Sequence, residues 1–514
     1  MATWYFDSVN GLDANNGTSS ATPKQNYHLF SHAGATFGDT FLFKRGTTQI
    51  VNTAFTAALR GNSETVRSRY AVYGESDYNY CTWTNPTAVG GMVLNVAARR
   101  FIDFEDMRFD AGGVNNNAVF AQVQGASNVN GLRFYRCHFY NSVSSGLNIG
   151  LQGGSTITGL VFGIVLEDCE AYDNGGHGVI LVGCEGAHVR RSKFYRNGAL
   201  LSTGGHGFSS GYGKKEDLTT GWTNTSGTIW QRSLAANELD IFYVQTTVFN
   251  YVRVRRTSGT ATAPGIGEYG VSGGVLYINV NRATNPSSQG VRYGWRKCRN
   301  LVIEDCEAYD NVWNQAAPYH EGHGFAFDDF ADDSCFLRNK SYNNQGAGFS
   351  INLGDRNRVV GNIAYGNWQS AVVNTPTDGT VITNNTFFNN NAGTGAHDAE
   401  IKFSNYCKDA VVSNNIVIST KAYSVANEAT NTGFTGTRNN LIGGTTALEK
   451  TPFLISTVTD DPLLDENNRP RTLTLKRAGT YLGGKDFHGK QFYDPPNIGA
   501  VDEATETLRY LFYR

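Results

Sequence analysis

Apolar and polar residues alternate with a period of two along most of this chain, and the alternation breaks at glycines and at Asn-Asn pairs. This pattern is typical of short β-strands joined by tight turns rather than of helices. A similar short phrase returns along the chain, for example as LEDCEAYDN at 166–174, IEDCEAYDN at 303–311 and ITNNTFFNN at 382–390. The sequence therefore predicts a series of similar strand units.

Aligning the phrases places one position of each in a single column: Met107, Cys137, Cys169, Ser192, Cys306, Asn339, Asn362, Asn385, Asn415 and Asn440. A repeat of roughly 20–50 residues built from strand-type residues indicates a solenoid whose coils stack on one another. We therefore predict an all-β fold, a right-handed single-stranded parallel β-helix of about ten coils, with its hand set by the general chirality of parallel connections. The asparagines of the column are expected to form a structural hydrogen-bonded ladder.

The irregularities of the repeat divide the chain. One gap between column members, from Ser192 to Cys306, contains strand-rich sequence that lacks the repeated phrase. We interpret this segment as a β-sandwich-like insertion. The predicted parts are an N-terminal cap with the first coils (1–100), β-helix (101–212), the insertion (213–296), further β-helix (297–445), and a C-terminal cap and tail (446–514).

Composition narrows the range of partners. The formal net charge is −2 and there are no Lys/Arg runs, which argues against nucleic acid as a partner. No apolar stretch is long enough to predict membrane insertion, and the segment MATWYFDSVNG lacks the features of a signal peptide. The eight cysteines show neither CxxC pairs nor metal-type spacing, so we expect free structural thiols, with neither a metal nor a cofactor.

The two ends of the chain carry a family resemblance. VNGLDANNGTSSATP at 9–23, GDTFLFKRG at 38–46 and KDFHGKQFYDPPNIGAVDE at 485–503 resemble the ends of pectate-lyase-like right-handed parallel β-helix proteins, especially bacteriophage tailspike and tail-fibre depolymerases. The resemblance implies a virion or extracellular enzyme that cleaves a bacterial surface polysaccharide (capsule, exopolysaccharide or lipopolysaccharide). It also implies a homotrimer, for which Ile180, Val182 and Val373 are candidate exposed apolar contacts.

Ionisable residues are most dense in YHEGHGFAFDDFADDS at 319–334, in the coil directly after the insertion. The inward positions of this coil are apolar, so Asp328 is expected on its outer face. Glycosidic hydrolysis needs two carboxyl groups. We predict that Asp328 is one, and that Asp329 or Glu321 is the second, with Asp332, Glu216 and Asp217 as further candidates. The predicted substrate contacts are His323, His320, Asn352, Lys402, Tyr319, Trp313 and Tyr212.

Other interpretations stay open. The acidic coil is also compatible with a turn that caps strands or holds calcium. A lyase would instead abstract a proton from a uronic acid, with His323 or Lys402 as the base, and a non-catalytic adhesin would only bind sugar. Three Gly-His-Gly units, at His177, His206 and His323, fall in consecutive coils. Because coils stack about 4.8 Å apart, the outer two imidazoles are too distant for easy zinc ligation, and a turn-capping ladder is expected.

Overall fold

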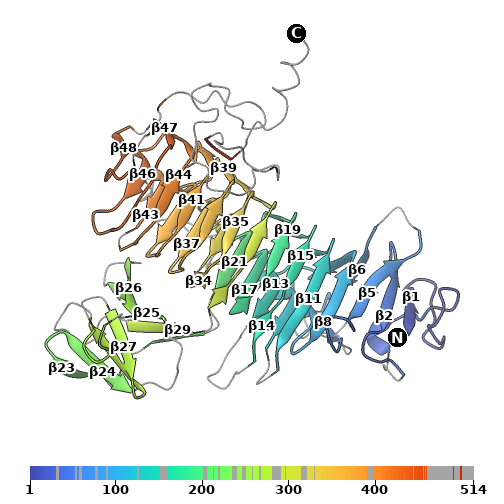
Figure 1. Cartoon of the computed structure of the whole chain (residues 1–514). Coiled ribbons are helices and arrows are strands. Elements are labelled where there is room, and N and C mark those ends of the chain that lie inside the picture. Colours follow the sequence, from blue (N-terminus) through green and yellow to red (C-terminus); the bar gives the residue numbers. More distant parts are fainter. Residues whose placement is uncertain are drawn as a thin grey trace, which may run out of the picture.

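The computed structural model shows a long rod of stacked β-coils with a separate group of strands beside it (Figure 1). It describes the chain outside the following residues: 31–33, 52–54, 57–60, 76–78, 88–90, 124–126, 151–158, 201–204, 212–213, 218–219, 234–239, 246–249, 257–258, 265–267, 280–290, 296, 314–320, 329, 391–397, 405, 444, 455–456, 458, 460–489, 491–497 and 501–514. Only the backbone is described at 55–56, 214–217, 240–245, 250–256 and 291–295.

Successive coils contribute strands to three long parallel sheets. The first sheet, which we call sheet A, runs in the order β1 (Thr3–Phe6), β2 (Thr40–Lys44), β5 (Ser68–Tyr73), β8 (Arg100–Glu105), β11 (Val129–Tyr135), β15 (Val165–Glu167), β19 (His188–Arg190), β31 (Val302–Glu304), β35 (Cys335–Leu337), β38 (Arg358–Val360), β41 (Val381–Thr383) and β44 (Val411–Ser413). Short strands extend it: β14 (Val161–Phe162), β18 (Cys184–Glu185), β30 (Cys298–Arg299) and β34 (Ala331–Asp332).

Sheet B contains the repeated phrase. Its order is β3 (Thr48–Ile50), β6 (Cys81–Thr84), β9 (Met107–Asp110), β12 (His138–Tyr140), β16 (Glu170–Tyr172), β20 (Lys193–Tyr195), β32 (Glu307–Tyr309), β36 (Lys340–Tyr342), β39 (Ile363–Tyr365), β42 (Thr386–Phe388), β45 (Ile416–Ser419) and β47 (Asn440–Gly443).

Sheet C completes each coil. Its order is β4 (Phe55–Thr56), β7 (Met92–Asn95), β10 (Asn117–Gln122), β13 (Ser145–Gly150), β17 (Val179–Val182), β21 (Phe208–Gly211), β33 (Phe325–Phe327), β37 (Phe349–Asn352), β40 (Val372–Thr375), β43 (Ala399–Phe403), β46 (Tyr423–Asn427) and β48 (Ala447–Glu449). The described strands thus confirm the right-handed parallel β-helix. Sheets B and C each hold 12 strands rather than about ten, because the first coils lie before the regular phrases.

The core is a continuous column between the sheets. In sheet C, Leu147 pairs with Val179, Val179 with Phe208, and Phe208 with Phe325. All four side chains are fully buried. This register explains the strict alternation in the sequence, since a shift by one residue would turn every apolar side chain to the other face.

The predicted column of sheet B is present, with one correction. Cys137, Cys169 and Cys306 are buried, and all eight cysteines are free. The asparagines that follow donate from coil to coil, but Asn415 Nδ2 donates to Asn439 Oδ1 at 3.0 Å, whereas Asn440 pairs with Ile416 in β45. The prediction of Asn440 was wrong by one residue, because an Asn-Asn pair offers two candidates for the same place.

A second asparagine ladder lies at the turn between sheets B and C. Its side chains hydrogen-bond in sequence along the rod: Asn174, Asn197, Asn311, Asn344, Asn367 and Asn390. The ladder explains why glycine recurs at the start of the strands of sheet C. A Cβ at Gly207, for example, would lie 2.9 Å from Asn311 Nδ2 and 2.7 Å from the Gly324 carbonyl oxygen. The absence of a side chain at these glycines lets the amides approach the neighbouring strand closely.

The N-terminal end of the described rod is closed by the chain itself. At the N-terminus the segment that contains Lys24 pairs with β1, since Asp7 N donates to Lys24 O at 2.8 Å and Lys24 N donates to Tyr5 O at 2.9 Å. The 3-10 helix η1 (Tyr27–Leu29) then places Tyr27 in the core. The pairing of the Lys24 segment with β1 covers a sheet edge that would otherwise be open. Near the C-terminus Ala500 is buried, and its N–H donates to Thr386 Oγ1 at 3.0 Å, so this segment packs against the side of sheet B at β42.

The insertion leaves the rod after β21 and returns before β30. Its strand order is β22 (Lys214–Asp217), β29 (Val291–Trp295), β25 (Asp240–Gln245), β26 (Asn250–Arg256), β27 (Glu268–Ser272), β28 (Val275–Asn279), β24 (Ile229–Ser233) and β23 (Thr223–Ser226). Two four-stranded halves meet at a short parallel pairing of Arg255 and Arg256 with Glu268 and Tyr269. The two β-helical sections stack directly on each other, as Figure 1 shows.

No helix in the described part of the chain has the length and apolar character needed to cross a membrane.

Candidate active site

Asp328 lies where the insertion joins the rod. It follows β33, and its N–H donates to Ser210 O in β21 at 2.9 Å. Gly211, the last residue of β21 before the insertion, lies beside it, since a Cβ at Gly211 would be 3.9 Å from Asp328 O. The chain returns from the insertion at Lys297. Asp328 is therefore at the foot of the insertion, half-exposed on the outer side of sheet C.

Asn352 holds the Asp328 carboxylate from the next coil. Its Nδ2 donates to Asp328 Oδ1 at 3.1 Å. Strand β37 places it there because β37 pairs with β33 in parallel register, so equivalent positions of successive coils lie side by side. A hydrogen bond donated to a carboxylate favours its ionised form.

Glu321 supplies a second carboxyl group with different properties. It precedes β33, and its side chain is half-buried. Burial raises the pKa of Glu321 to about 7, and the negative charge of Asp328 adds to this effect. Two carboxyl groups therefore interact at one place on the rod: Asp328 accepts a hydrogen bond from an amide, and Glu321 is close to half-protonated at neutral pH.

His323 belongs to a ladder of stacked imidazoles. The rings of His177 and His206 are 4.9 Å apart, and those of His206 and His323 are 4.8 Å apart. Each Nδ1 accepts a backbone N–H from the next coil, and for His323 the donor is Ala347 N at 2.8 Å. Because Nδ1 must accept, the proton of each neutral ring lies on Nε2. Burial also lowers the pKa of His177 to about 4.

Lys402 lies farther along the same sheet and is paired. Its Nζ is 3.1 Å from Asp398 Oδ1, and Lys450 Nζ approaches the same carboxylate at 3.5 Å. In the strand pairing of sheet C, Lys402 lies beside Val373, and Val373 lies beside Ser350. Lys402 is therefore aligned with Ser350 and not with Asn352. The structure does not bring Lys402 into contact with Asp328.

The remaining predicted residues fall into two groups. Trp313 is 8% exposed, so its indole is mostly covered, and its backbone N–H donates to Gln345 Oε1 at 2.6 Å. Asp332 is 3% exposed, 2.8 Å from Lys297 Nζ, and accepts a hydrogen bond from Asp355 N, which is a structural arrangement. The side chains of Tyr212, Glu216, Asp217, Tyr319, His320 and Asp329 lie outside the described part.

The outer face of sheet C differs from the expectation of an open polar surface. Ser209 is 2%, Ala326 1% and Ser350 8% exposed. Val373, expected as an exposed apolar contact, is 7% exposed, while Ile180 and Val182 are half-exposed. Strand alternation correctly separates two faces, but it does not tell which part of the outer face is covered by other segments. Polar side chains are accessible at Asp328 and Asn352.

Glu400 is a carboxyl group that the sequence analysis missed. It is fully buried, and burial raises its pKa to about 7. Its two oxygens accept hydrogen bonds from Asn390 N at 2.9 Å and Asn390 Nδ2 at 2.8 Å. Glu400 thus takes the place of the next asparagine and ends the second ladder. The signal in the sequence was a glutamate in the register position where the two preceding coils have Ala371 and Gly348.

No family model matches this chain, and no curated protein matches it. Solved structures do match. XylC, in a complex with xylose, aligns with a TM-score of 0.52 and 10% identity over 98% of this chain and 99% of that chain. The A-module of mannuronan C-5 epimerase AlgE6 from Azotobacter vinelandii aligns with a TM-score of 0.50 and 12% identity over 84% and 92%. Tailspike protein 3 of bacteriophage CBA120 aligns with a TM-score of 0.48 and 9% identity over 85% and 60%, which is too weak to carry an argument.

The fold and these similarities define the class. The chain is a right-handed parallel β-helix protein. At this level of identity the similarities bear on the fold and not on the reaction.

Proposed function

We propose that this protein is a glycoside hydrolase that shortens a bacterial surface polysaccharide, with Glu321 as the general acid and Asp328 as its partner. The observation that carries the proposal is the pairing of a half-buried carboxyl group of pKa about 7 with a second carboxylate held by Asn352. A general acid works best when its pKa is close to the working pH. The long rod offers a rigid surface for an extended polymer.

In this reaction Glu321 donates its proton to the glycosidic oxygen as the bond from that oxygen to the anomeric carbon breaks. Asp328 then either takes a proton from the water that attacks the anomeric carbon or attacks this carbon itself. In the second case water releases the sugar, and Glu321 takes a proton from that water. The distance between the carboxyl groups in the substrate complex decides between inversion, at about 6.5–9.5 Å, and retention, at about 5–5.5 Å.

Hydrogen bonding favours hydrolysis over the lyase alternative. A lyase needs a base with a free lone pair. The Nδ1 lone pair of His323 is occupied by the Ala347 N–H, and its other nitrogen carries the proton. The Lys402 ammonium group is paired with Asp398 and has no lone pair while it is charged.

Product mass tests the proposal. The purified chain is incubated with capsular and lipopolysaccharide preparations from candidate hosts, and the polymers are sized and their ends analysed by mass spectrometry. We expect shortened chains whose mass includes one added water per cut. Unsaturated ends would contradict hydrolysis and identify a lyase, and binding without shortening would identify an adhesin.

Matched variants link the activity to the site. Asp328→Asn and Glu321→Gln are expected to lose turnover and keep polymer binding. Asp310→Asn is the control, because Asp310 is an exposed turn residue with φ of 55°, a conformation that asparagine tolerates. Full activity of Glu321→Gln would contradict the role of Glu321.

The proposed setting is a phage tail, in a homotrimer that acts on its host's polysaccharide. The terminal motifs support this setting, and the half-exposed Ile180 and Val182 offer apolar contact surface for a neighbouring copy. Light scattering at micromolar concentration is expected to give the mass of three chains, and the mass of one chain would contradict the trimer.

A further inference from the structure

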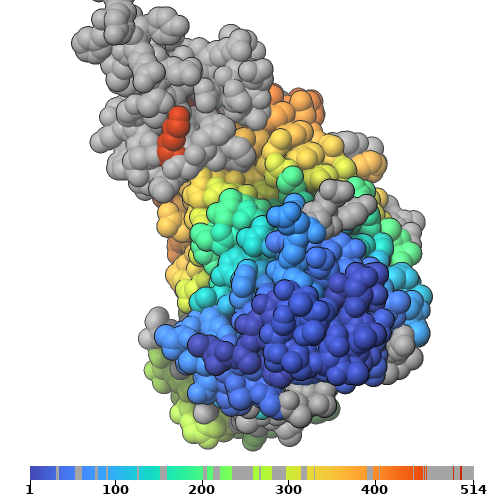
Figure 2. All heavy atoms as spheres, turned by 90° about the vertical axis from the view of Figure 1, so that its right-hand side faces the viewer, coloured from blue at the N-terminus to red at the C-terminus, as the bar shows by residue number. Residues whose placement is uncertain are grey.

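The N-terminal cap contains a pocket far from the candidate active site. It has a volume of about 450 Å³ and is lined by Trp4, Asp13, Asn16, Thr18, Lys24, Asn26, Leu29 and Phe30. Strands β1 and β35 are eight strand spacings apart in sheet A, which is roughly 40 Å at about 4.8 Å per strand. The pocket lies on the N-terminal end of the rod, the end that faces the viewer in Figure 2.

Two rings form the apolar side of this pocket. The Trp4 and Phe30 ring centroids are 4.9 Å apart and their planes are tilted by 54°. Trp4 Nε1 donates to Asp39 Oδ2 at 3.2 Å, which fixes the indole in place. Trp4 is partly exposed, so its ring is rigid and accessible before any ligand binds. Such preorganisation lowers the entropic cost of binding.

The charges that line the pocket are already compensated within the protein. Lys24 Nζ donates to Asp13 O at 3.0 Å and also to Asn15 O, and it lies 6.0 Å from the Phe30 ring centroid. Both oxygens of the Asp13 carboxylate accept hydrogen bonds from Asn26, one from its backbone N–H and one from its side-chain amide. The lining thus contains one cation, Lys24, and one anion, Asp13, and their charges cancel. This favours a neutral ligand over a charged one.

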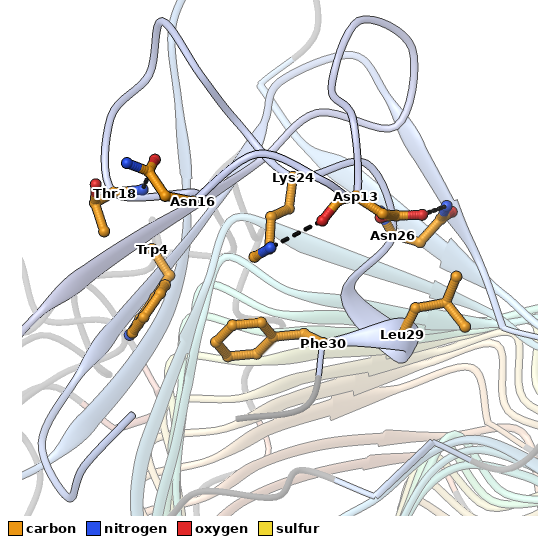
Figure 3. Close-up of a pocket in the computed structure, with 8 residues that line it drawn as sticks. All are labelled: Trp4, Asp13, Asn16, Thr18, Lys24, Asn26, Leu29 and Phe30. Atoms are coloured by element: carbon orange, nitrogen blue, oxygen red, sulfur yellow. Dashed lines mark hydrogen bonds between the residues drawn. The ribbon is translucent and has the colours of Figure 1, made fainter. Parts of the chain in front are cut away.

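Three polar groups of the lining are left for a ligand. Asn16 Oδ1 accepts from Thr18 N, but among the described contacts Asn16 Nδ2, Asn26 Oδ1 and the Thr18 hydroxyl have no protein partner. They offer a donor, an acceptor and a group that does both. Figure 3 shows Asn16 and Thr18 at the Trp4 end of the pocket and Asn26, with Asp13 and Leu29, at the other end.

We infer that this pocket binds a neutral sugar ring, as a second carbohydrate site separate from the site at Asp328. A pyranose combines apolar C–H faces, which suit the Trp4 ring, with hydroxyl groups that both donate and accept. A pocket of this size suits a small ligand. The inference does not depend on cleavage, since it concerns binding alone.

The tyrosine stack of sheet B is a poorer site for sugar. Tyr172 and Tyr195 are 5.0 Å apart with planes 8° apart, and Tyr195 and Tyr309 are 4.9 Å apart with planes 1° apart. Each ring face is therefore covered by its neighbour, and only ring edges reach solvent. The Trp4 ring is not part of such a stack.

Saturation-transfer NMR tests the inference with D-glucose, D-galactose, D-mannose and L-rhamnose as separate probes. We expect transfer to ring protons of at least one sugar, with affinity in the millimolar range. Thr18→Trp should fill the pocket and abolish this transfer, because Thr18 lines it with an exposed side chain. Ser20→Trp, an exposed position in the same segment, and Asp328→Asn, at the active site, should leave it unchanged.

Two results would overturn the inference. One is no transfer to any of the four sugars, the outcome expected of a pocket that serves a protein partner. The other is transfer that persists in Thr18→Trp, which would place the sugar elsewhere. Equal melting temperatures of Thr18→Trp and Ser20→Trp establish that the cap is still folded. A loss of transfer only in Asp328→Asn would also contradict a second site. Cleavage of polymer by Thr18→Trp remains the separate measure of the proposed function.

Discussion

Asn352 Nδ2 lies 3.1 Å from Asp328 Oδ1 and joins two neighbouring coils through a single charge-assisted hydrogen bond. The bond orients the carboxylate and lowers the free energy of its ionised form relative to the protonated form. Asn352 is thus a positioning residue for Asp328 in the proposed reaction.

Asn352→Ala is expected to reduce kcat/KM by roughly 10–100-fold, because a hydrogen bond to a charged group contributes about 1.5–3 kcal/mol. The pKa that governs Asp328 should also rise, and the acid limb of the pH–rate profile should move to higher pH. Asn352→Asp, which places a like charge against Asp328, should shift this limb further. An unchanged acid limb in both variants would contradict the positioning role.

The activity should decline as pH rises through about 7. Burial and the charge of Asp328 raise the pKa of Glu321 to about 7, so the protonated form that a general acid needs is present below this value and lost above it. The basic limb of kcat/KM is expected near pH 7. A basic limb that instead stays above pH 9 in the wild-type protein would exclude Glu321 as the acid.

Glu400 should make the fold less stable as pH rises. Its pKa is about 7 in the folded chain and its ordinary value is 4.5, so the folded state holds the proton more tightly. The free energy of unfolding then falls between about pH 4.5 and 7, by about 3 kcal/mol, and its contribution is constant above that range. Melting temperatures at pH 5 and pH 8 measure the effect.

Glu400→Ala removes this pH-dependent contribution and also leaves Asn390 donors without an acceptor, which lowers stability by about 1–3 kcal/mol. Its melting temperature should therefore be lower at pH 5 but vary less between pH 5 and 8 than that of the wild type. Glu185→Ala, at an exposed carboxylate, should keep the wild-type pH dependence. Equal pH dependence in all three proteins would contradict the role of Glu400.

Gly207→Ala is expected to destabilise the rod by about 1–3 kcal/mol, because the added methyl group would meet Asn311 Nδ2 and the Gly324 carbonyl. Gly211→Ala, at the other end of the same strand, is the matched control, since its nearest contact would be 3.9 Å away. Comparison of the two melting temperatures separates the close approach to the ladder from a general effect of alanine in place of glycine.

The alternation of apolar and polar residues was enough to predict the β-helical fold, because the column of inward-facing residues in sheet C follows directly from it. The second ladder was not predicted, although Asn197 and Asn311 end equivalent phrases and its partner glycines recur in the coils. The pKa of Glu321 was not predictable in this way. It depends on burial by segments distant in sequence and on the position of Asp328, neither of which a repeat pattern contains. The burial of Ser209 was unpredictable for the same reason, since it too depends on segments distant in sequence.

The second ladder passes the insertion without interruption: Asn197 Nδ2 donates to Asn311 Oδ1 at 2.9 Å although 114 residues separate them in sequence. The two β-helical sections are thus held together by non-covalent contacts. The polypeptide that links them keeps the two sections close to each other but does not itself form their interface. A chain cleaved within the insertion should remain one particle, and two fragments produced from separate genes should reassemble. For the organism that encodes it, the insertion is then a position where a foreign domain can be exchanged without redesign of the rod.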